Sequence, residues 1–367
     1  MVPNASLPVK LAERRMTKHG PFARVQHHRA LKGSEEKGRE VNWCTLAQSV
    51  EAGRQTTEDE ALAILRSSDD ELLDLLQAAF RLRSRWFGRR VDLHVIRNAR
   101  SGGCTEDCAY CSQSGSATTA ISSYSMQPLR QIAEGARAAK AAGAVRYCIV
   151  TSGRGPSGEE VDEICDAART IRSEVDIQIC TSLGLLTTDQ ARRLVEAGVN
   201  RYNHNLETSE RYYSNICTTH TYADRERTIR TAKAAGLEVC CGGLLGMGET
   251  DTDRVALAMA LRKLDVDSVP VNLLDPRKGT ALENQPRLTP CEGLRALAMF
   301  RFTLPKKEIR IAGGREAVLR TLQPLALFPA NSMFIEGYLT TPGQPADRDL
   351  QMLKDAGFEV GKIVAAD

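Results

Sequence analysis

The fold of this chain is decided by residues 175–205, Val175-Asp-Ile-Gln-Ile-Cys-Thr-Ser-Leu-Gly-Leu-Leu-Thr-Thr-Asp-Gln-Ala-Arg-Arg-Leu-Val-Glu-Ala-Gly-Val-Asn-Arg-Tyr-Asn-His-Asn205. A short β-rich run at 175–180 is followed by a helix-like segment at 188–197, and a second β-rich run follows at 199–205. Gly198 closes the helix-like segment where a helix end favours glycine. A strand, a helix and a strand in this order predict a parallel sheet, because parallel neighbours need a long crossover.

The same alternation extends in both directions. A helical pattern near 57–85 and a leading strand at 91–96 precede it, and a weak last strand is predicted near 332–336. Further helices are expected at 128–142, 158–172, 221–235, 250–264 and 290–303, and further strands at 145–150, 237–241, 268–273 and 308–312. The total of eight strands favours an α/β fold, a closed (β/α)8 TIM-type barrel of parallel strands with an N-terminal helical extension.

The bulk composition restricts the possible partners. The chain has 367 residues, a formal net charge of +3 and 42% apolar residues. A nearly balanced charge does not require a nucleic acid or an anionic membrane, and no apolar run approaches the roughly 20 residues of a membrane-spanning helix. Eleven cysteines, an odd number, indicate free thiols in a reducing compartment, so we expect a cytoplasmic protein.

The N-terminal residues differ from the rest of the chain in charge and in hydrophobic periodicity. Before position 33 the basic side chains are opposed by Glu13 alone, and hydrophobic periodicity is weak. We therefore predict a basic, disordered arm at 1–50 and a barrel domain at 51–367. Two alternatives remain open: translation could start at Met16, or the arm could be an organelle transit peptide, which would make the protein mitochondrial.

The phase of each strand predicts which side chains face the lumen of the barrel, because successive side chains alternate between its two faces. The predicted lumen set is Asp176, Gln178, Cys180, Glu238, Cys240, Asn272, Glu308 and Arg310, and the predicted outward set is Val175, Ile177, Ile179, Leu237, Val239, Cys241, Ile309 and Ile311. Cys148 lies near the end of its strand, where the phase is ambiguous.

Polar lumen positions are unusual, because a packed barrel normally fills its lumen with Val, Ile and Leu. Buried polar groups are costly unless they are paired or bind a ligand. Cys148, Cys180, Cys240 and Arg310 come from four strands and could converge on one metal site. The alternative is that these cysteines are small buried hydrophobic residues.

A second set of cysteines follows the leading strand. Cys104, Cys108 and Cys111 have the spacing C-x3-C-x2-C. A [4Fe–4S] cluster normally has four cysteine ligands, so with three the fourth comes from elsewhere or one iron stays open for a substrate. Alternatively, these cysteines could supply half of the ligands of a structural zinc site. Such a site needs a second pair of ligands, and the sequence shows no C-x2-C or H-x3-5-H pair downstream. The spacing therefore favours an iron–sulfur cluster.

This loop, with Tyr110 before its last cysteine, is similar to the signature of the radical S-adenosylmethionine superfamily. From about residue 60 to 360 the chain more specifically resembles the biotin synthase family. The matching stretches are Asn98-Ala-Arg-Ser-Gly-Gly-Cys-Thr-Glu-Asp-Cys108, Tyr202-Asn-His-Asn-Leu-Glu-Thr-Ser209, Val239-Cys-Cys-Gly-Gly-Leu-Leu-Gly-Met-Gly-Glu249, Ser268-Val-Pro-Val-Asn272 and Ala312-Gly-Gly-Arg-Glu316. Five separated motifs in register are far more specific than the loop alone.

The resemblance implies a role for each matching residue. A [4Fe–4S] cluster would be held by Cys104, Cys108 and Cys111, with S-adenosylmethionine on its open iron. An auxiliary [2Fe–2S] cluster, the implied sulfur donor, would be held by Cys148, Cys180, Cys240 and Arg310. The implied cofactor-binding residues are Tyr110, Glu207, Gly242, Gly246 and Glu249. Asn205 and Asn272 would lie near the substrate.

The implied activity is that of a sulfurtransferase of the radical S-adenosylmethionine type, which inserts sulfur into dethiobiotin to form biotin. The resemblance also implies a flavodoxin- or ferredoxin-type electron donor and a homodimer. The alternatives are another radical S-adenosylmethionine enzyme acting on a small substrate, and a non-catalytic iron–sulfur electron carrier. Five cysteines match no ligand position and are expected to be structural thiols: Cys44, Cys165, Cys217, Cys241 and Cys291.

Overall fold

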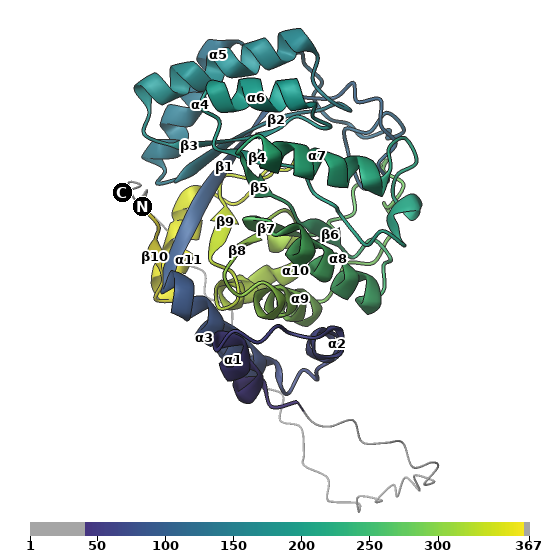
Figure 1. The fold of residues 1–367 in the computed structure, drawn as a ribbon, viewed down its shortest axis with the longest axis vertical. Helices are drawn as coiled ribbons and strands as arrows, with labels where there is room; N and C mark the ends of the chain where they lie inside the picture. The colour runs from purple at the N-terminus through teal and green to yellow at the C-terminus, as the bar shows by residue number, and fades with distance from the viewer. Residues whose placement is uncertain (1–40, 363–367) are drawn as a thin grey trace, which may run out of the picture. The chain divides into compact units, whose positions relative to one another are not determined.

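Eight parallel strands form a closed barrel in the computed structural model, which describes residues 41–362 (Figure 1). In barrel order they are β1 (Arg90–Arg100), β2 (Arg146–Thr151), β3 (Gln178–Ser182), β4 (Arg201–Asn203), β5 (Glu238–Cys240), β7 (Ser268–Leu273), β8 (Glu308–Ile311) and β9 (Ser332–Phe334). The barrel closes because β1 pairs with both β2 and β9. The predicted (β/α)8 barrel is confirmed. Two short strands lie off this ring: β6 (Gly243–Leu245) pairs with β7, and β10 (Glu359–Val360) pairs with β1.

Helices surround the strands (Figure 1). The helices after β1 are α4 (Leu129–Ala141), α5 (Gly158–Glu174), α6 (Thr188–Glu196), α7 (Tyr222–Ala234), α8 (Asp251–Leu264), α9 (Pro290–Thr303), α10 (Arg315–Leu319) and α11 (Ala346–Asp355), with 3₁₀ turns η1 (Tyr213–Asn215) and η2 (Arg320–Leu327). The N-terminal helical extension consists of α1 (Trp43–Glu51), α2 (Glu58–Leu65) and α3 (Leu72–Phe87). Both α2 and α3 pack against α9.

The long helical pattern predicted near 57–85 is divided into two helices. The break lies at Arg66–Glu71, where the Glu71 carboxylate accepts hydrogen bonds from the backbone and hydroxyl of Ser68, both at 2.9 Å. Serine side chains and acidic acceptors compete with the helical backbone in this way. The apolar periodicity continues across the break and does not reveal it.

Local sequence fixes the helix ends. The helices α5, α6, α7, α8 and α9 all begin with a capping box, in which a Ser or Thr and the residue three positions later satisfy each other's backbone N–H groups. Three helices end with glycine at positive φ, at Gly143, Gly198 and Gly236. The predicted helix end at Gly198 is therefore confirmed, and Gly143 and Gly236 end their helices in the same way, because glycine has no Cβ that would clash in this conformation.

Strand phase separates the hydrophobic core from the lumen as predicted. Ile179 and Cys241 belong to the large apolar cluster between the barrel and its helices. Cys180 instead packs with Cys148, Ala312 and Phe334 in a separate cluster. Cys240 faces Arg310, whose Nη1 donates to its Sγ at 3.4 Å.

Charged side chains fill the lumen near the amino ends of the strands. Glu308 accepts from Arg201 at 2.8 Å and also pairs with Arg310. Burial alone would raise the pKa of Glu308, but Arg201 and Arg310 outweigh it and hold this pKa well below its usual range. The carboxylate therefore stays ionised, and the buried cations around it are compensated.

Two boundaries differ from the sequence predictions. Asp176 was expected in the lumen, but β3 begins only at Gln178, and the Asp176 side chain is 80% exposed and pairs with Lys140 on α4. The reason is that the backbone of Val175 still caps α5. Helix α1 begins at Trp43, inside the range 1–50 that was assigned to a disordered arm, so the folded part begins before residue 51. Residues 1–40 lie outside the described part of the chain.

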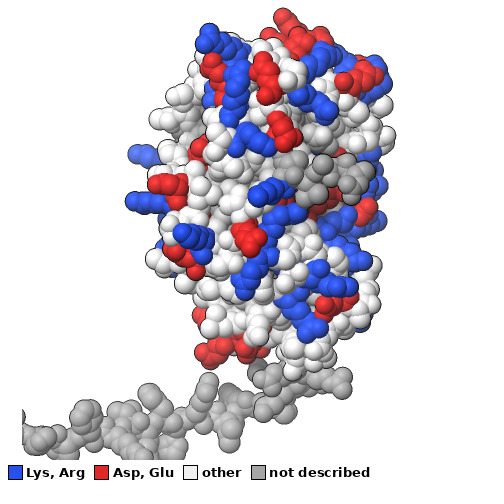
Figure 2. All heavy atoms as spheres, turned by 90° about the vertical axis from the view of Figure 1, so that its left-hand side faces the viewer, with Lys and Arg blue, Asp and Glu red and all other residues white. Residues whose placement is uncertain are grey.

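The surface mixes both charges. On the face drawn in Figure 2, basic and acidic side chains are interspersed, as the small net charge of +3 leads one to expect. Within residues 41–362, no helix is long and apolar enough to cross a membrane.

A buried ion pair fixes the C-terminal helix α11 to α10. Arg315 donates to both carboxylate oxygens of Asp349 at 2.7 Å, and the Asp349 side chain is fully buried. We predict that Asp349→Ala lowers the free energy of unfolding by about 3–5 kcal/mol, because the buried guanidinium loses its fully buried carboxylate and is left with the longer ion pair to Glu316, at 3.4 Å. Urea unfolding followed by circular dichroism measures this loss. Asp347→Ala, on the exposed side of the same helix, is the control and should change stability by less than about 0.5 kcal/mol; equal losses in both variants would contradict the prediction.

Candidate functional site

A cavity opens at the carboxyl ends of the barrel strands, where (β/α)8 enzymes carry their active sites. It consists of two adjoining parts of about 260 and 180 Å³. Tyr110, Cys111, Asn205 and Glu207 line both parts. The predicted site residues from the cysteine loop and from the β4 end therefore meet at one cavity.

The cysteine loop leaves β1 and folds back on itself through short turns. The backbone N–H of Cys111 donates to the Cys108 carbonyl at 3.1 Å, and that of Gly115 donates to the Glu106 carbonyl at 2.9 Å. Ala109 N–H donates to the Ile216 carbonyl at 2.9 Å, which ties the loop to the segment before α7. These bonds fix the path of the loop backbone that carries the three cysteines.

The three loop thiols fit an iron–sulfur cluster. Cys104, Cys108 and Cys111 are free and half-buried, and all of them line the smaller part of the cavity. The Cys111 Sγ accepts from the backbone N–H of Gln113 at 3.4 Å, a contact that stabilises a thiolate. Three converging thiols beside a polar cavity are the donor set that an iron–sulfur cluster requires.

Glu207 lies in the cavity wall in a left-handed backbone conformation, φ 69°. Its Oε1 is 3.8 Å from Nη1 of Arg225, a buried residue of α7. Burial raises the pKa of Glu207, and the charge of Arg225 opposes this shift. Arg225 also donates to the Tyr110 hydroxyl at 3.4 Å and to the Asn205 carbonyl at 2.8 Å. One arginine thus orients three predicted site residues.

The two predicted asparagines face the cavity but are held by backbone groups. The Asn205 side chain accepts from Gly242 N–H at 3.1 Å. The Asn272 amide donates to the Gly243 carbonyl at 3.1 Å and accepts from Gly313 N–H at 2.9 Å. Each amide is therefore fixed in orientation before any ligand binds, which reduces the entropic cost of binding.

The glycine-rich segment 242–249 packs against the strands next to the cavity. A Cβ on Gly242 would lie 2.0 Å from the Pro270 carbonyl oxygen, so glycine is needed for close strand packing. Glu249 accepts from the backbone N–H groups of Gly246 and Met247 at 2.8 and 2.7 Å. Gly242, Gly246 and Glu249 do not line either part of the cavity. The structure gives these three residues a role in shaping the segment.

Deeper in the barrel, the other predicted cysteines also converge. Cys148 and Cys180 are register partners on β2 and β3, and Cys240 on β5 contacts Arg310 on β8. All four side chains are at least 96% buried. Spacing along the sequence could not show this convergence, because it results from the closure of the barrel.

Two buried side chains that face the lumen with these cysteines carry polar atoms without a partner. Among the described residues, both ring nitrogens of His94 and Nε of Arg310 are buried without a hydrogen-bond partner. Burial, followed by the charge of Arg310, lowers the pKa of His94 well below its usual range, so its ring is neutral. Buried polar atoms are normally paired. Three thiols with orphaned donors around them fit an iron–sulfur cluster.

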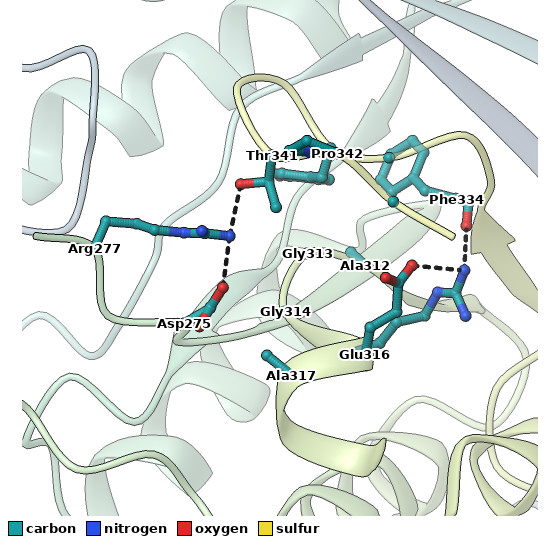
Figure 3. A pocket seen from close by; sticks show the side chains of 14 residues that line it. Asp275, Arg277, Ala312, Gly313, Gly314, Glu316, Ala317, Phe334, Thr341 and Pro342 are labelled. Carbon is teal, nitrogen blue, oxygen red and sulfur yellow. Dashed lines mark hydrogen bonds and ion pairs between the residues drawn. The ribbon is translucent and has the colours of Figure 1, made fainter. Parts of the chain in front are cut away.

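A neighbouring pocket of about 170 Å³ extends the cavity on the side of α10 (Figure 3). Gly313 and Gly314 line both this pocket and the larger part of the cavity. In Figure 3, Arg277 reaches across between Asp275 and Thr341, with contacts of 2.6 and 3.0 Å. The hydrogen bond from Arg277 connects the segment after β7 to the one after β9 at the cavity rim.

Three side chains at the site were not predicted from the sequence: Arg225, Glu106 and His220. Only Arg225 had a usable signal, since it shares the inward stripe of α7 with Thr228, Ile229 and Ala232, where a charge is unexpected. Glu106 and His220 lie in loops and contact each other across a sequence separation of 114 residues. Periodicity contains no information about such a contact.

Comparisons with known proteins show which families this chain resembles. Residues 99–261 match the model of the radical SAM superfamily, and residues 270–359 match that of the biotin and thiamin synthesis associated domain. The chain is 53% identical over 317 residues to the biotin synthase of Salinibacter ruber, covering 86% of this chain and 88% of that protein. It is 50% identical over 321 residues to the biotin synthase of Bacillus subtilis, covering 88% and 96%.

Solved structures show the same fold at lower identity. A methylornithine synthase superposes with a TM-score of 0.76 at 22% identity, covering 86% of this chain and 97% of that chain. The FeFe-hydrogenase maturase HydG of Carboxydothermus hydrogenoformans superposes with a TM-score of 0.75 at 20% identity, covering 88% and 80%. At these identities the likeness concerns the barrel fold alone.

Proposed function

Because this chain belongs to the biotin synthase family of radical S-adenosylmethionine enzymes, we propose that it inserts sulfur into dethiobiotin to form biotin, using its two cysteine sets for two different clusters. The family itself implies a [4Fe–4S] cluster and S-adenosylmethionine. The residue assignment for each cluster follows the matching motifs and the positions of the thiols. The observation that supports it best is that the barrel brings together two separate sets of three thiols. One set lines the cavity at the carboxyl ends of the strands, and the other lies deeper in the lumen.

We assign the [4Fe–4S] cluster to Cys104, Cys108 and Cys111, and the [2Fe–2S] cluster to Cys148, Cys180, Cys240 and Arg310. When bound, the first cluster supplies the electron that cleaves S-adenosylmethionine to a 5′-deoxyadenosyl radical, and the second supplies sulfur. Radical chemistry is needed because an unactivated C–H bond is not acidic enough for an enzyme base to remove its proton. The residues of the chain bind, orient and shield the reactants.

Glu207 and Tyr110 are proposed to bind the nucleoside part of S-adenosylmethionine. Both line the cavity beside the loop thiols, and Arg225 fixes Tyr110 and lies beside the Glu207 carboxylate. An oriented carboxylate can accept hydrogen bonds from ribose hydroxyls. Gly242, Gly246 and Glu249 are proposed to act indirectly. They do not line the cavity, but they shape the segment that supports this wall.

Asn205 and Asn272 are proposed to contact dethiobiotin between the two clusters. Both line the larger part of the cavity, which lies at the carboxyl ends of the strands that carry the deeper cysteines. The surrounding walls bury the reacting atoms and keep out dioxygen and dissolved hydrogen donors such as thiols, which would otherwise quench a radical.

Three further assignments follow the family. We propose a flavodoxin- or ferredoxin-type protein as the electron donor and a homodimer as the functional assembly. The relatives reported above are bacterial proteins, which favours the cytoplasm over a mitochondrial location. The predicted basic arm lies mostly in residues 1–40, outside the described residues.

Anaerobic product analysis tests the function directly. The reconstituted, reduced protein should convert dethiobiotin into biotin and form methionine and 5′-deoxyadenosine when S-adenosylmethionine is added. Formation of 5′-deoxyadenosine without biotin would point to another radical S-adenosylmethionine enzyme. Absence of both products, with both clusters present, would favour an electron carrier.

The Glu207 carboxylate provides a sharper test of cofactor binding. We predict that Glu207→Gln weakens the binding of S-adenosylmethionine about 10–100-fold, because hydrogen bonds to a charged acceptor contribute about 1.5–3 kcal/mol. Equilibrium binding to the cluster-loaded protein measures the Kd. Glu207→Asp keeps the carboxylate and suits the left-handed backbone at this position, so its Kd should remain within a few-fold of the original. Equal Kd values for the Glu207→Gln variant and the wild-type protein would refute the assignment.

A further inference from the structure

Cys217, expected from the sequence to be a structural thiol, contacts the cysteine loop that carries Cys104, Cys108 and Cys111. Its Sγ is 3.8 Å from the Cys108 Sγ. His220, on the same segment before α7, places Nδ1 at 3.2 Å and Nε2 at 3.8 Å from the Cys217 Sγ. One ligand atom from each of Cys108, Cys217 and His220 lies within 4.8 Å of the other two.

These distances match the coordination of a single metal ion. Two sulfurs bound to one tetrahedral zinc ion at about 2.3 Å are about 3.8 Å apart, and a sulfur and a nitrogen ligand are about 3.6 Å apart. The distance between the two Sγ atoms has the first value, and the two Cys217–His220 distances bracket the second. We propose that Cys108, Cys217 and His220 form a mononuclear site for a zinc-type divalent ion.

Acidic side chains complete the surroundings of this site. Glu106, which is 94% buried, contacts His220 Nδ1 at 2.5 Å and accepts from the Thr219 hydroxyl at 2.9 Å. A carboxylate that binds one ring nitrogen of a metal-ligating histidine orients the other nitrogen toward the ion. Asp107 Oδ1 lies 3.2 Å from the Cys217 Sγ. Two thiolates, an imidazole and nearby carboxylates are a donor set suited to zinc.

The site shares Cys108 with the proposed [4Fe–4S] cluster, so one thiol cannot serve both at once. A mononuclear ion therefore occupies the site only while the loop has no cluster, and it delays cluster loading until it leaves. Zinc binds such sites more tightly than ferrous iron does. The zinc site itself does not depend on the proposed function; only the competition rests on the cluster assignment of Cys108.

Cobalt(II) titration of the full chain, purified anaerobically and stripped of iron and sulfide, tests the site. Cobalt in a thiolate-rich tetrahedral site has characteristic visible absorption. The wild-type protein should bind one more equivalent, with this absorption, than Cys217→Ala or His220→Ala. Cys104→Ala and Cys165→Ala should match the wild type, since neither thiol belongs to the site. Cys217→Ser, with nearly the same shape, should also lose the equivalent, and circular dichroism should show all variants folded.

The site is disproved if Cys217→Ser binds cobalt with wild-type stoichiometry and spectrum. It is also disproved if Cys104→Ala loses the equivalent, because the cluster loop alone would then hold the ion. For the competition, zinc-loaded protein is reconstituted with iron and sulfide. Zinc should slow cluster loading in the wild type and leave the loading of Cys217→Ser unaffected. Equal slowing in both proteins would overturn the competition, while failure of the proposed function would appear separately, as missing biotin with intact cobalt binding.

Discussion

Cys240→Ala should remove the [2Fe–2S] cluster and abolish biotin formation, while Cys241→Ala should retain both. The two cysteines are neighbours in the chain but lie on opposite sides of the barrel wall. The Cys240 Sγ accepts from Arg310 Nη1 at 3.4 Å, whereas Cys241 packs in the apolar cluster beneath the helices. Removing the outward sulfur creates only a small cavity, which costs about 1–2 kcal/mol of stability.

Iron and sulfide contents, together with the absorption spectra of the reconstituted variants, measure the loss. Formation of 5′-deoxyadenosine depends on the loop cysteines, so both variants should still cleave S-adenosylmethionine. This activity also serves as the folding control for Cys240→Ala. The reverse result, cluster loss in Cys241→Ala alone, would contradict the strand phase on which the assignment depends.

Cys108→Ala should eliminate the [4Fe–4S] cluster and reduce 5′-deoxyadenosine formation to the level of a protein-free control. The loss should be complete, because two thiols cannot replace three in holding the cluster. Cys217→Ala is the matched control, since its sulfur lies only 3.8 Å from the Cys108 sulfur but does not belong to the C-x3-C-x2-C loop. It should retain the cluster and the cleavage activity.

In both variants, the spectrum of the reduced protein measures whether the cluster is present, and the rate of 5′-deoxyadenosine formation measures the cleavage activity. If Cys217→Ala loses the cluster and Cys108→Ala retains it, Cys217 is the ligand and the loop motif has been misassigned. Loss in both variants would make Cys217 necessary for holding Cys108 in place. Only retention in Cys217→Ala supports the three-cysteine assignment.

Much of the fold could be predicted because its signals are local. Strand phase correctly separated Cys240 from Cys241, since side chains alternate along every strand. Helix ends followed from single residues such as Gly198, whose φ of 92° favours glycine. Where local signals compete the prediction was wrong: the backbone of Val175 still caps α5, and Asp176 is therefore exposed.

By itself, the sequence determined the alternation of strands and helices, the spacing of the loop cysteines and the phase of the lumen residues. Only the tertiary structure decided which distant side chains meet: Arg225 beside Glu207, Arg315 with Asp349, and Cys217 next to Cys108 across a separation of 109 residues. The physical reason is that backbone sterics and side-chain periodicity act over a few residues. Contacts between distant segments arise when the barrel closes, and no local pattern encodes them.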